Sequence, residues 1–156
     1  MLPHKHLAIS TIVGAAAWWQ TGTAAAMGAA LAGGVLPDLD HVVDYAYYYW
    51  RRKHRLILPL HGYEYAVVGL ICAVLRSAPL LAVATLSYFI HLLADQVENQ
   101  TNRFGYSILY RTWQRFRLEQ ISASPVAAAR GREDDIRMLV NLLGRFGIRD
   151  LRKGEG

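Results

Sequence analysis

The sequence predicts an all-α protein, an antiparallel helical bundle associated with a membrane and followed by a C-terminal amphipathic helical extension. The bundle is predicted by four apolar stretches of helical length. They run over Leu7 to Trp19, Ala24 to Leu36, Tyr65 to Leu75 and Pro79 to Ala94. Short connections make antiparallel neighbours the default arrangement. We therefore expect the first and third helices to begin, and the second and fourth to end, at one common end of the bundle.

The composition favours a membrane-associated single domain. The hydrophobic fraction of 53% and the mean hydropathy of +0.14 are high for a soluble protein. No apolar run, however, reaches the roughly 18 to 20 residues of an unambiguous transmembrane helix. Cys72 is the single cysteine, so no disulfide framework is expected. We divide the chain into a metal-site bundle over residues 1–110 and a basic helical extension over residues 111–156, which belongs to the same domain or forms an appendage.

Local signals set the boundaries of the four helices. Thr23 can cap the second helix, and Pro37 ends it. Pro59 allows the third helix to start shortly after it, and Pro79 suits the first turn of the fourth helix. The tryptophan pair at residues 18 and 19 is typical of a membrane-interface anchor. We therefore expect the first segment to be retained rather than cleaved as a signal peptide.

The remaining segments are less regular. The stretch from Asp44 to Arg55 is rich in tyrosine and then basic, which fits a loop or a short helix along an interface. Ile108 to Leu118 has the pattern of a basic amphipathic segment. Pro125, preceded by a serine, predicts the start of a last helix that runs to about Phe146. The tail from Arg149 onward is expected to be frayed.

The net charge of +5 is unevenly placed along the chain. Basic residues follow the second and fourth apolar stretches, at the end of the bundle that these stretches share: Arg51, Arg52, Lys53, Arg55, Arg103, Arg111, Arg115 and Arg117. By the positive-inside rule this end faces the cytoplasm if the bundle crosses a bilayer. A basic rim suits an anionic lipid surface or a phosphate-bearing substrate, and Arg55 is our candidate for binding substrate charge. A solvated basic face is the plain alternative.

Histidine and aspartate residues gather at the same end, where apolar stretches begin or finish. His91 and Asp95 lie one helical turn apart, so both side chains project from one face. The full set of candidate metal ligands is His6, Asp38, Asp40, His41, His61, His91 and Asp95. An isolated histidine on an apolar helix is usually a hydrogen-bonded core residue, and aspartate is common in turns. Burying so many ionisable groups together without a cation would nevertheless be costly.

The ligand types indicate which metal is bound and what it does. Imidazole and carboxylate without thiolate favour a catalytic over a structural site, with zinc as the first choice and manganese or iron as alternatives. We expect one or two ions, because bound zinc lowers the pKa of water to about 7 and two ions stabilise both attacking and leaving oxygens. Which of Asp38 and Asp40 is a ligand stays open. Glu64 and Asp40 are the candidate general bases, and Glu64 would serve equally well by orienting His61.

On these residues the chain resembles the bacterial LexA-regulated, membrane-bound, metal-dependent hydrolase family. The likeness covers about residues 4 to 110 and rests on four pieces: His6-Leu7, Leu36-Pro37-Asp38-Leu39-Asp40-His41, His61 after a basic stretch, and His91-Leu92-Leu93-Ala94-Asp95. The resemblance implies an all-helical membrane-associated bundle in the inner membrane of a bacterium. It also implies metal-dependent hydrolysis.

More distantly, the order of histidines and aspartates is similar to the first part of zinc-dependent phospholipase C. On that likeness one ion would take Asp38 or Asp40 together with His61, His91 and Asp95. Asp95 would bridge to a second ion bound by His6, and the reaction would be phosphoester hydrolysis. No histidine follows His91, so the ligands that complete the phospholipase centre are missing and a full three-metal site is not expected.

The sequence thus predicts a membrane-associated hydrolase that acts on a phosphoester or lipid-like substrate through metal-activated water at the cytoplasmic face. Its expected partners are membrane lipid and a small-molecule or lipid phosphoester. The alternative is a non-catalytic membrane protein whose metal is structural or transported. A nucleic-acid binder built around Ile108 to Leu118 would lack any base-reading motif, so nucleic acid is not expected as a partner.

Overall fold

The computed structural model describes residues 3–51, 55–99 and 101–145. The secondary-structure elements within these residues are helices, which confirms the all-α prediction. They are α1 (Pro3–Thr21), α2 (Ala24–Val35), the 3₁₀ helix η1 (Leu36–Asp40), α3 (His41–Arg51), α4 (Tyr63–Leu75), α5 (Pro79–Glu98), α6 (Ile108–Trp113), α7 (Leu118–Ile121) and α8 (Pro125–Arg145). Arg52, Lys53 and the tail from Arg149, all discussed above, fall outside the described residues.

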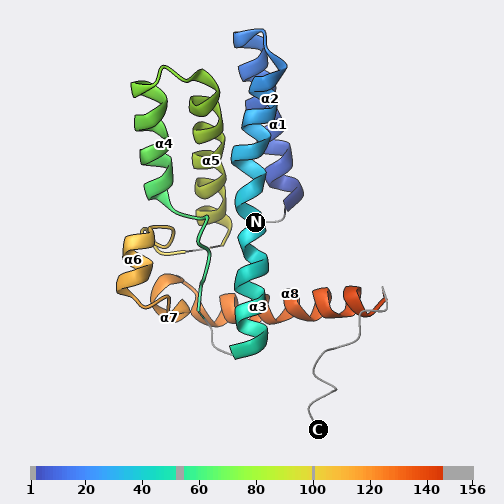
Figure 1. Ribbon diagram of the computed structural model, residues 1–156. Coiled ribbons are helices and arrows are strands. Elements are labelled where there is room, and N and C mark those ends of the chain that lie inside the picture. Colours follow the sequence, from blue (N-terminus) through green and yellow to red (C-terminus); the bar gives the residue numbers. More distant parts are fainter. Residues whose placement is uncertain (1–2, 52–54, 100, 146–156) are drawn as a thin grey trace.

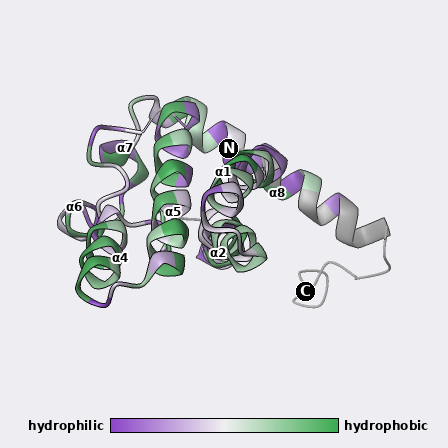
Figure 2. Ribbon diagram, turned by 90° about the horizontal axis from the view of Figure 1, so that it is seen from above, coloured by the Kyte–Doolittle hydropathy of each residue, from purple (hydrophilic) through white to green (hydrophobic). Residues whose placement is uncertain are grey.

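Helix α5 is the centre of the bundle. α2 and α4 pack against α5, and α1 packs against both α2 and α5, as Figures 1 and 2 show. A short turn joins α1 to α2 and another joins α4 to α5, so the helices run up and down as predicted. The starts of α1 and α4 and the ends of α2 and α5 therefore meet at one end of the bundle, which we call the site end.

Small residues allow α2 to lie very close to α5. A Cβ atom at Gly33 would collide with the backbone of Ala84 on α5, and one at Gly34 would lie 2.7 Å from the hydroxyl oxygen of Ser87. Without a side chain at these positions the two backbones can approach each other, as at other helix contacts built from small residues. This approach brings the end of α2 against the last turns of α5.

The site end is covered by α3 and α8. α3 continues the path of α2 beyond η1, and α8 lies across it (Figure 1). The guanidinium of Arg132 on α8 forms a buried ion pair with Asp44 on α3. The same carboxylate accepts a hydrogen bond from the backbone N–H of Ile57 at 2.7 Å, and the Tyr48 hydroxyl donates to Glu133 at 3.1 Å. These polar contacts join α3, α8 and the segment before α4.

The outer face of the bundle is strongly apolar (Figure 2). On α4 alone the exposed large side chains are Tyr65, Val67, Val68, Leu70, Ile71, Val74 and Leu75. Exposed apolar patches of this kind mark membrane or protein contacts. Among the described residues one helix, α5, is long and apolar enough to cross a membrane, while α4 is a shorter apolar helix. The surface is thus consistent with the predicted membrane association, although length and composition alone give it weak support.

One segment adopts an expected alternative, and another differs from the expectation. From Asp44 to Arg51 the tyrosine-rich stretch belongs to a regular helix, α3, which is the short-helix alternative, and the first turn of α3 also contains His41. The predicted amphipathic segment from Ile108 to Leu118 is broken into α6 and α7, because Arg115 (φ 52°) and Phe116 (φ 59°) adopt left-handed backbone conformations. Neither residue is a glycine, so the sequence carries no local signal for this turn. The last helix begins at Pro125, as predicted.

Replacing Arg132 by methionine should destabilise the protein by about 3–5 kcal/mol, because it leaves the buried Asp44 carboxylate without its cationic partner. The measurement is the unfolding midpoint of purified protein in detergent. The control is Arg137→Met, which changes an exposed arginine on the same helix and should leave the midpoint nearly unchanged. Equal effects of the two variants would show that the ion pair does not hold α8 in place.

Candidate metal centre

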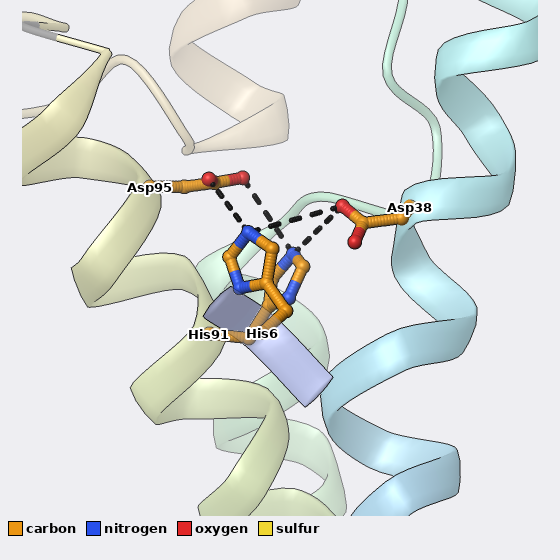
Figure 3. Close-up of side chains that lie close together, drawn as sticks. All are labelled: His6, Asp38, His91 and Asp95. Atoms are coloured by element: carbon orange, nitrogen blue, oxygen red, sulfur yellow. Dashed lines mark hydrogen bonds and ion pairs between the residues drawn. The ribbon is translucent and has the colours of Figure 1, made fainter. Parts of the chain in front are cut away.

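Four side chains from three elements converge at the site end (Figure 3). They are His6 of α1, Asp38 of η1, and His91 and Asp95 of α5, and each can offer one ligand atom within 4.8 Å of the others. The Nε2 atom of His6 lies 3.0 Å from Asp95 Oδ1, and Nε2 of His91 lies 3.8 Å from Asp38 Oδ1. We call this group the first site.

A second group shares two members with the first. It contains Asp38, His41, His61 and Asp95, again with ligand atoms within 4.8 Å of one another. His61 Nε2 lies 3.2 Å from Asp95 Oδ2, and His41 Nε2 lies 3.7 Å from Asp38 Oδ1. Because the carboxylates of Asp38 and Asp95 belong to both groups, they are placed to bridge two cations. We call this group the second site.

The outward hydrogen bonds of two histidines fix which ring nitrogen faces the cluster. His91 Nδ1 lies 2.9 Å from the carbonyl oxygen of Gly34, which can only accept, so this nitrogen donates. His61 Nδ1 lies 3.1 Å from the Asp40 carboxylate and donates in the same way. The two Nε2 atoms then face each other at 2.9 Å. If both rings are neutral, two lone pairs point at one another, an arrangement that a cation or a shared proton must stabilise.

The environment of Asp38 favours a bound cation. Both of its carboxylate oxygens are buried, and neither has a hydrogen-bond donor among the described residues. Burial raises the pKa of Asp38 above its ordinary value, and the nearby Asp95 carboxylate raises it further. A buried carboxylate without a donor costs free energy. A divalent cation between Asp38 and the histidines would satisfy both oxygens.

The pKa values of the two imidazoles of the second site are shifted in opposite directions. Burial lowers the pKa of His41 to about 4, and the neighbouring His61 adds to this effect, so His41 is neutral at pH 7 and able to bind a metal. Burial also works to lower the pKa of His61, but hydrogen bonds with Asp40 and Asp95 raise it above the ordinary value. His61 therefore attracts a positive charge to its position, whether proton or metal ion.

The comparison with protein families identifies the group to which this arrangement belongs. The family model described as YdjM inner membrane protein matches residues 1–143. The chain belongs to the YdjM inner membrane protein family. No curated protein and no solved structure matches the chain. Membership of the YdjM family confirms the predicted inner-membrane resemblance at the level of the family, whereas the distant likeness to phospholipase C finds no support.

In this YdjM family member, the sequence-predicted ligands fall into the two sites with one exception. His6, Asp38, His41, His61, His91 and Asp95 all belong to the first site, the second site or both. Asp40 belongs to neither. Its buried carboxylate accepts hydrogen bonds from the backbone N–H of Leu60 at 2.7 Å and from His61 Nδ1. Asp38, and not Asp40, is thus placed among the candidate ligands, whereas Asp40 is placed to orient the imidazole of His61.

Glu64 and Arg55, which the sequence analysis assigned to catalysis and substrate binding, do not join the cluster. The Glu64 carboxylate accepts hydrogen bonds from Ser107 Oγ at 2.6 Å and from the backbone N–H groups of Ile108 and Leu109 at the start of α6. Partial burial works to raise the pKa of Glu64, but these hydrogen bonds lower it below the ordinary value. Arg55 pairs through its backbone with Arg117.

Arg111 contacts the metal centre in a way that the sequence did not reveal. It was counted with the basic rim, yet its side chain is fully buried. Its guanidinium donates to the carbonyl oxygen of Leu58 at 2.9 Å and to that of His61. It thereby holds the backbone of a candidate ligand. Arg111 is one of several arginines in a polar stretch. The composition of that stretch therefore does not indicate that the Arg111 side chain is buried.

Replacing Asp40 by asparagine should weaken metal binding by about 10- to 100-fold, because His61 loses the carboxylate that fixes its ring orientation. The measurement is a titration of metal-stripped protein with Zn²⁺. Asp134→Asn, a change at an exposed carboxylate on α8, is the matched control and should bind as the wild type does. Unchanged affinity in the Asp40 variant would mean that His61 is held in place without it.

Replacing Glu64 by glutamine should cost about 1 kcal/mol of stability at pH 7, as loss of a helix cap does, and leave the bound metal unchanged. Because folding lowers the Glu64 pKa, its contribution is present above the ordinary glutamate pKa and is lost as the pH falls through the folded value. The difference between the two proteins should therefore shrink in acid. Unfolding curves from pH 7 down to about pH 3 test this, with the exposed Glu119→Gln as control.

Proposed function

We propose that this protein is a membrane-associated metal-dependent hydrolase that cleaves a phosphoester or lipid-like substrate at the cytoplasmic face of the inner membrane. The observation that carries the proposal is the pair of facing Nε2 atoms of His61 and His91, 2.9 Å apart and flanked by two shared carboxylates. Two bound divalent cations, preferably zinc, would polarise a phosphoryl oxygen and activate a water at neutral pH.

The protein's own residues have distinct parts in this proposal. His6 and His91 would hold one cation, His41 and His61 the other, and Asp38 and Asp95 would bridge the pair. Carboxylate and imidazole ligands suit a hydrolytic zinc, manganese or iron centre. Asp40 lies beside His61 and keeps that ring in position. It is close enough to accept a proton from the His61 imidazole.

Substrate access would come from the side of His41. Its side chain is 26% exposed, whereas the side chains of His6, His61, His91 and Asp95 are at most 1% exposed. Exposed arginines, among them Arg51, Arg103 and Arg115, lie on elements at the same end of the bundle. They would attract an anionic headgroup and place this end at the cytoplasmic surface.

The second candidate function is a structural or transported metal in a non-catalytic membrane protein. The near-complete burial of four ligands favours it, because a closed shell leaves little room for a substrate. The two candidates differ in one measurable respect. Both require metal, but only the hydrolase turns over an ester.

Elemental analysis of purified protein should find up to two divalent ions per chain, and the double variant His91→Ala, Asp95→Ala should lose them. Hydrolysis of a phosphodiester and of a phosphomonoester, measured on both proteins, should be metal-dependent in the wild type and absent in the variant. His4→Ala is the control, because His4 is exposed and belongs to neither site. Equal metal content in the two proteins would remove the proposed site, and metal without any turnover would favour the second candidate.

A further inference from the structure

An open apolar groove of about 310 Å³ lies on the surface of the bundle, and its lining includes residues that directly precede two candidate ligands. α5 forms its floor, and α2 and α4 form its two walls. The lining residues are Ala32, Gly33, Leu36, Pro37, Leu60, Tyr65, Gly69, Leu81, Ala84, Thr85 and Tyr88. Alanine and glycine at four of these positions leave the space that larger side chains would fill.

One end of the groove adjoins the metal centre. Pro37 precedes the ligand Asp38, and Leu60 precedes the ligand His61. Tyr88 lies one turn before His91 on α5. The Tyr88 hydroxyl is occupied, because it lies 2.7 Å from the Leu60 carbonyl oxygen and accepts from the Gly62 N–H at 2.8 Å. The Tyr88 hydroxyl thus forms its hydrogen bonds with backbone groups and presents no free polar atom to the groove.

The dimensions and chemistry of the groove match a single hydrocarbon chain. From Leu81 to Tyr88 the floor helix rises about 10 Å. The volume lies at the small end of the range for ligand pockets, which suits one chain rather than two. At the end distant from the metal, the wall formed by α4 continues into exposed apolar side chains such as Val68 and Ile71. A chain lying in the groove would therefore pass directly into the apolar part of the bilayer.

We propose that the groove between α2 and α4 binds one acyl chain of a membrane lipid phosphoester, with the lipid's phosphate held at the metal centre. The inference rests on the proposed function and names its substrate class. A soluble phosphoester reaches the same metal centre without the groove. Chain binding and hydrolysis are thus separable properties.

The test uses full-length protein in phosphatidylcholine vesicles that contain a phosphatidic acid with a photoreactive diazirine partway along one acyl chain, at the depth of the groove. Irradiation and peptide mapping should place labels on the segments around Ala32 and Ala84, and unlabelled phosphatidic acid should compete them away. Ala32→Trp, which fills the groove from an exposed position, should reduce this labelling by about tenfold or more. Ala25→Trp, an exposed change near the start of the same helix, should leave it unchanged.

Labelling that is spread evenly over the exposed face of α4 and is not reduced by competitor would overturn the inference. So would a change of oligomeric state in Ala32→Trp without loss of labelling, since the groove would then bind a second copy of the chain. Hydrolysis is read separately, on phosphatidic acid and on p-nitrophenyl phosphate. Saturable groove labelling without hydrolysis of either substrate would contradict the proposed function alone. If Ala32→Trp and the wild type hydrolyse both substrates at equal rates, the chain-binding site alone would be contradicted.

Discussion

The arrangement of the site end depends on one electrostatic constraint. Four imidazoles and two carboxylates occupy a volume in which every candidate ligand atom lies within 4.8 Å of others in its group. Water is largely excluded from it, and buried ionisable groups at such distances are tolerated only when positive and negative charges balance closely. The Nδ1 atoms of His61 and His91 are committed to Asp40 and Gly34, which leaves the Nε2 atoms to face one another. A cation bound between the rings, or a proton shared between them, would resolve this repulsion.

The packing of the bundle serves that convergence. The glycines at the end of α2 allow its last turn to lie against α5, and the Gly34 carbonyl oxygen becomes the acceptor that orients His91. Arg111 holds the backbone of His61 by donating to its carbonyl oxygen, and Asp40 orients the imidazole ring of His61. His61 and His91 are therefore each held from behind by a group that does not itself face the cluster. Sites whose supporting groups are locked by hydrogen bonds keep their geometry when ligands exchange.

Much of this could be predicted from the sequence, for identifiable physical reasons. Alternating apolar stretches separated by short turns allow few arrangements, so the convergence of His6, Asp38, His61 and His91 followed from chain order alone. The parts that escaped prediction depend on side-chain direction. The sequence predicted a shared helical face for Glu64 and His61, but α4 begins only at Tyr63, after His61. Glu64 caps α6 instead, because the segment after α5 folds back beside it. The turn at Arg115 and Phe116, which ends α6 below Arg111, has no sequence signature.

The ligands come from opposite ends of the described bundle sequence, and this has a consequence for how the protein matures. His6 and Asp95, in hydrogen-bond contact, are separated by 89 positions along the chain. No metal can be held by both until α5 has been synthesised and has packed against α1 and α2. An ion bound by the proposed site would therefore enter late in assembly, because a chain arrested before α5 lacks both His91 and Asp95.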